Sequence, residues 1–147
     1  NHTMSDYLRL TLQRDTNGTG ELFAEVSVNG FSGVGSAWFN LSQIHIFGES
    51  LASNYPLLAD GDYSLRGGVW STGSPDQLSE VNLSLKFYPM GALGEIGCRV
   101  DLAGCGLYGS KAAHSVSVEL HTHYEQLRRF GLALITLVDG QVNEISL

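Results

Sequence analysis

Apolar and polar residues alternate along much of this chain, a pattern typical of β-strands that bury one face. The alternation is clearest from Val81 to Phe87, where every second residue is apolar. Alternation and turn residues together predict seven strands, over Tyr7–Arg14, Glu21–Asn29, Phe31–Phe39, Tyr63–Trp70, Leu78–Tyr88, Leu93–Ala103 and His114–His121.

Glycines mark two features of the first three predicted strands. Asn17 and Gly18 lie between the first and second strands, and an Asn-Gly pair there is a strong hairpin signal. Gly33 and Gly35 interrupt the third strand. They indicate either a β-bulge or a close approach of another part of the backbone.

The first predicted helix runs from about Leu41 to Asn54, where apolar residues recur at helical spacing. Asn40 precedes it and Gln43 follows three residues later, which is a capping-box pattern. Pro56 prevents the helix from continuing.

A second helix is predicted from about His123 to Val138. Thr122 and Glu125 form a capping-box pattern at its start. Gly140 lies just beyond its end and is suited to a left-handed terminating conformation.

These elements predict an α+β fold. One apolar and one polar face on each strand is an antiparallel habit, and the two amphipathic helices need an apolar surface to cover. We therefore expect a twisted, largely antiparallel sheet of about six to seven strands, which can curl toward a half-barrel, packed with two helices. A length of 147 residues without a composition shift indicates one domain over residues 1–147, and residues 1–3 are interpreted as a remnant of cloning.

The net charge of −7 comes from 15 acidic and 8 basic residues, and the basic residues are scattered. Nucleic acids and anionic membranes both select for clustered Lys and Arg, so we expect neither as a partner. No apolar run approaches the roughly 20 residues of a membrane-spanning helix. The charge is compatible with a basic protein partner.

The sequence holds no complete catalytic constellation. Cys98 and Cys105 are too few for a disulfide framework, which favours a reducing, cytoplasmic location. Cys98 falls on the apolar face of a strand and is expected to be buried. Cys105 could act as a nucleophile with His114, but no activating cation is visible beside it. No serine lies in a Gly-x-Ser-x-Gly elbow, and no cofactor motif is present.

His121 and His123 would point the same way on a strand, as paired metal ligands do. The competing interpretation assigns Thr122 and Glu125 to the helix cap, with no third ligand in view. We favour the cap and keep a metal site as the alternative.

Six charged residues occupy predicted outward positions on the strands, namely Arg9, Glu25, Lys86, Arg99, Asp101 and Glu119. We expect them to form a mixed-charge sheet face of the kind that docks another protein. Trp38 and Trp70 are expected in the core, since aromatic residues are mostly buried. An exposed Trp would instead indicate an interface or a sugar-binding platform.

The order of signals from residue 30 to residue 140 resembles a group of small bacterial proteins that includes immunity proteins of the WapI type. The matching features are Gly30–Gly33 before Trp38, the helix with Leu41, Phe47 and Leu51, the strand Leu83–Phe87, the segment Gly94–Val100, and a strand entering a Tyr-Glu-Gln-Leu helix. The resemblance implies a non-enzymatic protein that neutralises a toxin by binding it. It carries over no catalytic residue.

Two hypotheses follow for the function. The first is a cytoplasmic, non-catalytic binding protein, such as a toxin-immunity protein, that needs no cofactor. The second is a small-molecule or carbohydrate binding module or enzyme, with its pocket on the concave face of the sheet or at the loop from Gly104 to Ala113.

Overall fold

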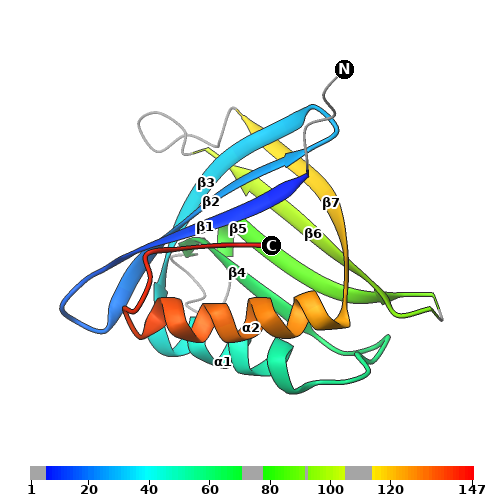
Figure 1. Ribbon diagram of the computed structural model, residues 1–147. Coiled ribbons are helices and arrows are strands. Elements are labelled where there is room, and N and C mark those ends of the chain that lie inside the picture. The colour runs from blue at the N-terminus through cyan, green and yellow to red at the C-terminus, as the bar shows by residue number, and fades with distance from the viewer. Residues whose placement is uncertain (1–5, 71–77, 92, 105–113) are drawn as a thin grey trace.

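The computed structural model describes residues 6–70, 78–91, 93–104 and 114–147, without the side chains of residues 69, 70 and 78–80. These residues form an α+β fold of two helices and eight strands in two antiparallel sheets (Figure 1). Sheet A has the strand order β3 (Phe31–Asn40), β2 (Thr19–Val28), β1 (Tyr7–Arg14) and β8 (Glu144–Ser146). Sheet B has the order β4 (Tyr63–Trp70), β5 (Leu78–Met90), β6 (Glu95–Ala103) and β7 (Ser115–His123).

The prediction of α+β class and antiparallel pairing is confirmed, but the prediction of one sheet with six to seven strands is wrong. The sheets are separate and do not close into a barrel. The strand missed by the sequence is β8, in which Ile145 pairs with Leu10 of β1. Three residues are too few for alternation to register, and alternation does not say which strands pair.

The nine predicted elements are all present, and their ends agree with the structure to within two residues. The helices are α1 (Leu41–Ser53) and α2 (Tyr124–Val138). The predicted hairpin of β1 and β2 is confirmed, with Gly18 at a φ of 83° in its turn. Asn29 and Gly30 join β2 to β3 with φ values of 52° and 86°, as a two-residue turn with two left-handed residues requires.

The two helices begin and end differently. Gln43 accepts a hydrogen bond from the backbone N–H of Asn40 at 2.9 Å, so the predicted capping box of α1 is supported. Gly140, at a φ of 81°, ends α2, where the N–H of Gln141 bonds to the carbonyl of Thr136 at 3.2 Å. This six-to-one bond is the mark of a Schellman motif.

The predicted capping box at the start of α2 is wrong. The capping position is His123, which makes no side-chain cap, because β7 continues two residues further than expected. Thr122 is buried in that strand and donates to Gln126 Oε1 at 2.7 Å. Glu125 instead accepts from Arg128 and Arg129 at 2.7 and 3.1 Å.

Sheet A and sheet B touch each other through the small residues of β3. A Cβ added at Gly35 would lie 2.9 Å from the carbonyl oxygen of Asn82, and one at Gly33 would lie 2.5 Å from Val116 Cγ1. The pairing of β2 with β3 is continuous, without a bulge. The second sequence interpretation, a close backbone approach, therefore explains Gly35, whereas Gly33 leaves room for the side chain of Val116.

Where the sheets diverge, the helices fill the space between them. Figure 1 shows α1 and α2 lying together at the lower end of the molecule, beneath the strands. Their backbones come so close that a Cβ on Gly131 would lie 2.5 Å from the carbonyl oxygen of Gly48. Helices pack this closely only where side chains are absent at the crossing point.

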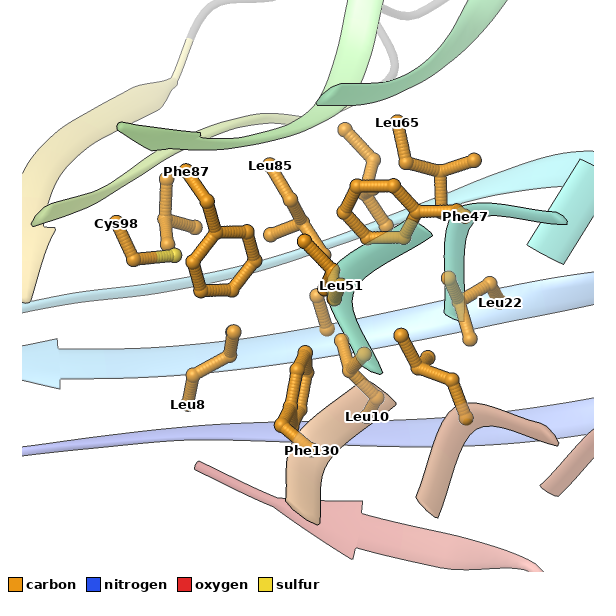
Figure 2. Close-up of a cluster of buried hydrophobic side chains, with 14 of the residues drawn as sticks. Leu8, Leu10, Leu22, Phe47, Leu51, Leu65, Leu85, Phe87, Cys98 and Phe130 are labelled. Atoms are coloured by element: carbon orange, nitrogen blue, oxygen red, sulfur yellow. The ribbon is translucent and has the colours of Figure 1, made fainter. Parts of the chain in front are cut away.

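An aromatic cluster forms the centre of the core (Figure 2). The ring of Phe87 in β5 lies 6.1 Å from that of Phe47 in α1 and 5.9 Å from that of Phe130 in α2. Leucines from both sheets surround these rings, including Leu10 and Leu85, which are fully buried. No helix among the described residues is long and apolar enough to cross a membrane.

Several sequence expectations fall outside the described part of the chain. These are residues 1–3, Cys105 as a candidate nucleophile, the side chain of Trp70, and the loop from Gly104 to Ala113 beyond its first residue.

Candidate functional site

The six charged candidates do not share one face. Arg9 and Glu25 lie on the outer face of sheet A, whereas Lys86, Arg99, Asp101 and Glu119 lie on the outer face of sheet B. Alternation correctly gave the outward direction of each side chain. It could not tell that the strands belong to two sheets, because sheet membership depends on long-range pairing.

A trough of about 510 Å³ crosses the outer face of sheet A. Residues from all four strands of the sheet line it, together with Ala103 and Gly104 at the end of β6. The described residues of its lining are Arg9, Thr11, Phe23, Ala24, Glu25, Val34, Gly35, Ser36, Ala103, Gly104 and Glu144. We call this surface the sheet A trough.

Ion pairs fix the charged part of the trough. Arg9 Nη1 lies 2.8 Å from Glu25 Oε1, and Arg9 Nε lies 3.9 Å from Glu144 Oε1. The guanidinium carbon also lies 5.0 Å from the centre of the Tyr7 ring. Each of these interactions is exposed and individually weak, but together they hold one orientation of Arg9 against the sheet.

Three apolar side chains are exposed beside this charge cluster. Phe23, Val34 and Trp38 are 39%, 68% and 55% exposed. Phe23 pairs with Ser36, so Val34 and Trp38 are its two diagonal neighbours on β3. Side chains of this size reach one another across such diagonals, so the three form one patch. We call Phe23, Val34 and Trp38 the apolar patch.

The prediction that Trp38 lies in the core is wrong. Gly35, Ala37 and Phe39 occupy the inward positions of β3, and Trp38 has the opposite parity. Two neighbouring aromatic residues, Trp38 and Phe39, left the choice of face open in the sequence. Gly33 and Gly35 determine which face of β3 points inward, because only small residues there allow sheet B to approach. Trp38, which has the opposite parity, therefore points outward.

The outer face of sheet B is polar throughout its centre. Ser64, Lys86, Arg99 and Glu119 follow one another across its four strands in a single row. Arg99 is held by Asp101 at 3.5 Å and by the hydroxyl of Ser117 at 3.0 Å.

Glu119 is joined to two neighbouring side chains on the outer face of sheet B. Its carboxylate accepts a hydrogen bond from the Tyr88 hydroxyl and lies 2.9 Å from His121 Nε2. The Tyr88 hydrogen bond, followed by the His121 contact, holds the pKa of Glu119 below its usual value. Burial and the same hydrogen bond raise the pKa of Tyr88. Glu119 and His121 are therefore partners of each other in this network.

No metal centre forms around His121 and His123 in the described residues. Within ranges 6–70, 78–91, 93–104 and 114–147, no three His, Cys, Asp or Glu side chains are placed to hold a metal ion. His123 ends β7 and precedes the first turn of α2.

Cys98 is fully buried in β6, as the sequence predicts. Burial raises the pKa of its thiol, which keeps it protonated and inert as a nucleophile. The pairing of Cys105 with His114 falls outside the described residues.

The apolar patch beside the ion pairs of the sheet A trough is the strongest site in the described structure. An exposed cluster of aromatic and aliphatic groups next to fixed charges can bind a surface that presents both apolar and charged groups.

No protein-family model matches the chain, and no curated protein matches its sequence.

Proposed function

We propose that this chain is a non-catalytic, cytoplasmic binding protein that docks a protein partner on the outer face of sheet A, as a bacterial toxin-immunity protein would. The observation that carries the proposal is the apolar patch. Phe23, Val34 and Trp38 expose apolar groups on one sheet face, while the equivalent face of sheet B is polar.

The charges around the patch suggest the chemistry of the partner. Glu25 and Glu144 flank a single cation, Arg9, and Glu21 lies directly across from Trp38. In the described part of the chain, the patch is therefore bordered by more carboxylates than cations, and the whole chain has a net charge of −7. A partner that presents an apolar side chain surrounded by Lys or Arg would complement it.

The test is purification of the tagged chain from its source cells, followed by identification of any partner present in stoichiometric amount. Genes adjacent to that of the chain supply the first candidates. The double variant Phe23→Thr, Trp38→Thr should lose the partner, because two anchors of the patch are removed while strand propensity is kept. The affinity should fall at least about tenfold.

The matched control is Leu93→Thr. Leu93 is 93% exposed, on the turn between β5 and β6, so its replacement changes surface hydrophobicity away from the patch. A partner retained equally by the wild type, the double variant and the control would contradict docking at the patch. Recovery of no stoichiometric protein would contradict the proposal as a whole.

A small ligand is the second candidate for the same trough. Its volume of about 510 Å³ falls within the range of small-molecule sites, and Phe23 lies beside carboxylates that can accept hydrogen bonds from sugar hydroxyls. Calorimetric titration with neutral mono- and disaccharides distinguishes the two. Saturable binding that is lost in Phe23→Thr would favour the ligand over the protein.

A further inference from the structure

The outer face of sheet B contains a second hollow, which protein docking on sheet A does not involve. It has a volume of about 450 Å³ and is lined by three cations, Arg66, Lys86 and Arg99. The whole chain has 8 basic residues against 15 acidic ones. Three of its eight cations therefore converge at one place on a net-negative protein. We call this place the cationic hollow.

Strand register brings the three cations together. Lys86 lies directly opposite Arg99 in the pairing of β5 with β6. Arg66 lies opposite Ser84, two residues before Lys86, in the pairing of β4 with β5. Like charges placed directly opposite each other destabilise a sheet, and an anion bound between them removes the repulsion.

Two of these cations, Arg66 and Lys86, form no ion pair with the described residues. Arg99 is held by Asp101, and the carboxylate of Asp62 accepts from the Ser64 hydroxyl at 2.5 Å. Neither Arg66 nor Lys86 contacts a carboxylate within 4.0 Å in that part of the chain. Among the described residues that line the hollow, three cations and two carboxylates give a positive balance of charge.

We infer that the cationic hollow binds a phosphate-type oxyanion, either inorganic phosphate or the phosphate group of a small molecule. Cations from three strands can reach different oxygens of a tetrahedral dianion. A carboxylate offers only one edge, which a single Arg satisfies. The hydroxyls of Ser64 and Ser84 also line the hollow and can donate to further oxygens.

The experiment is an NMR titration of the full chain with inorganic phosphate, with the ionic strength held constant by sodium chloride. Because contacts between exposed charges are individually weak, the expected Kd is on the order of 1 mM. The amide shifts should saturate and should be confined to β4, β5 and β6. Shifts that do not saturate, or that spread equally over both sheets, would overturn the inference.

Two variants and one control locate the binding. Lys86→Gln and Arg66→Gln should each weaken phosphate binding about threefold or more, since each removes a cation that has no ion pair among the described residues. Arg129→Gln is the control, because Arg129 is 73% exposed on α2 and its loss changes the net charge equally. Equal weakening in Lys86→Gln and Arg129→Gln would show that only net charge matters.

A second phosphate source is distinguished in the same titration. Glycerol phosphate at the same concentration should bind as inorganic phosphate does if the hollow accepts a carried phosphate group. Binding of inorganic phosphate alone would restrict the site to the free ion. The variant Phe23→Thr, Trp38→Thr should leave phosphate binding unchanged, so the failure of either proposal can be seen without the other.

Discussion

Sheet A and sheet B are alike on the inside and different on the outside. Both inner faces are apolar, and fully buried residues such as Leu10 in sheet A and Leu85 in sheet B meet in one core. On the outside, sheet A exposes the apolar patch of Phe23, Val34 and Trp38. Sheet B instead presents Lys86 and Arg99 with serines and carboxylates.

The difference between the outer faces separates the requirements of folding from those of binding. Folding needs one apolar face on each sheet, and both inner faces meet that need. The polar outer face of sheet B is what solvent favours. Apolar groups gathered on the outer face of sheet A contribute little to folding, so that face is where binding a partner would gain most.

The largest effect is expected on the shared inner side. Leu134 is fully buried in α2, so Leu134→Ala should lower the free energy of unfolding by about 2–5 kcal/mol through lost burial and a residual cavity. Denaturant unfolding measures the change. Leu132→Ala, at a position 45% exposed on the same helix, should cost under about 1 kcal/mol. Equal costs at the two positions would mean that α2 does not fill the space between the sheets.

The next test concerns the contact between the sheets. Gly35→Val should cost about 1–3 kcal/mol, because its side chain would meet the backbone of Asn82 and Leu102 Cβ, 3.2 Å from the added Cβ. Ser32 lies at an outward position of the same strand, so Ser32→Val should leave the free energy of unfolding nearly unchanged. Thermal unfolding compares the two. A neutral Gly35→Val would show that β3 can move away from sheet B.

A smaller effect is expected on the outer face of sheet B. Tyr88→Phe removes the hydrogen bond to Glu119 and should cost about 0.5–1 kcal/mol at neutral pH, since the pair is partly exposed. The pKa of Glu119 is lowered in the folded state, so the stabilisation is fully present above the ordinary pKa of a Glu carboxyl and is lost as the pH falls through the lowered pKa of the folded state.

Urea unfolding of the wild type and the Tyr88→Phe variant, at pH values from about 3 to about 7, tests that expectation for the carboxyl of Glu119. The difference between the two proteins should shrink toward the acid end. Tyr7→Phe is the matched tyrosine control on sheet A, where the ring lies beside Arg9 and a similar pH dependence is not expected. A difference that grows on acidification would contradict the role assigned to Glu119.

The smallest effect on stability is expected within the apolar patch. Val34 is 68% exposed, and Val34→Thr keeps its shape and strand propensity, so the free energy of unfolding should change by under about 0.5 kcal/mol. Partner affinity should nevertheless fall, because an apolar contact is replaced by a hydroxyl. A clear loss of stability would instead mean that the patch is part of the fold, and the contrast between the two outer faces would lose its functional meaning.

Local chemistry in the sequence determined the elements of this protein. Alternation placed seven strands, helical spacing placed α1 and α2, and Gly140 marked the end of α2, because these signals act between near neighbours. The inward position of Cys98 and the outward positions of the six charged candidates followed from the same parity. The sequence did not predict β8, because three residues are too few to show a periodic pattern.

Only the tertiary structure decided how these elements combine. The division into two sheets separated Arg9 and Glu25 from the other four charged candidates, and register placed Lys86 opposite Arg99. Because sheet B packs against Gly33 and Gly35 on the inner face of β3, Trp38 lies on the outer face. These outcomes depend on contacts between residues far apart in the chain, whose energies no local pattern contains.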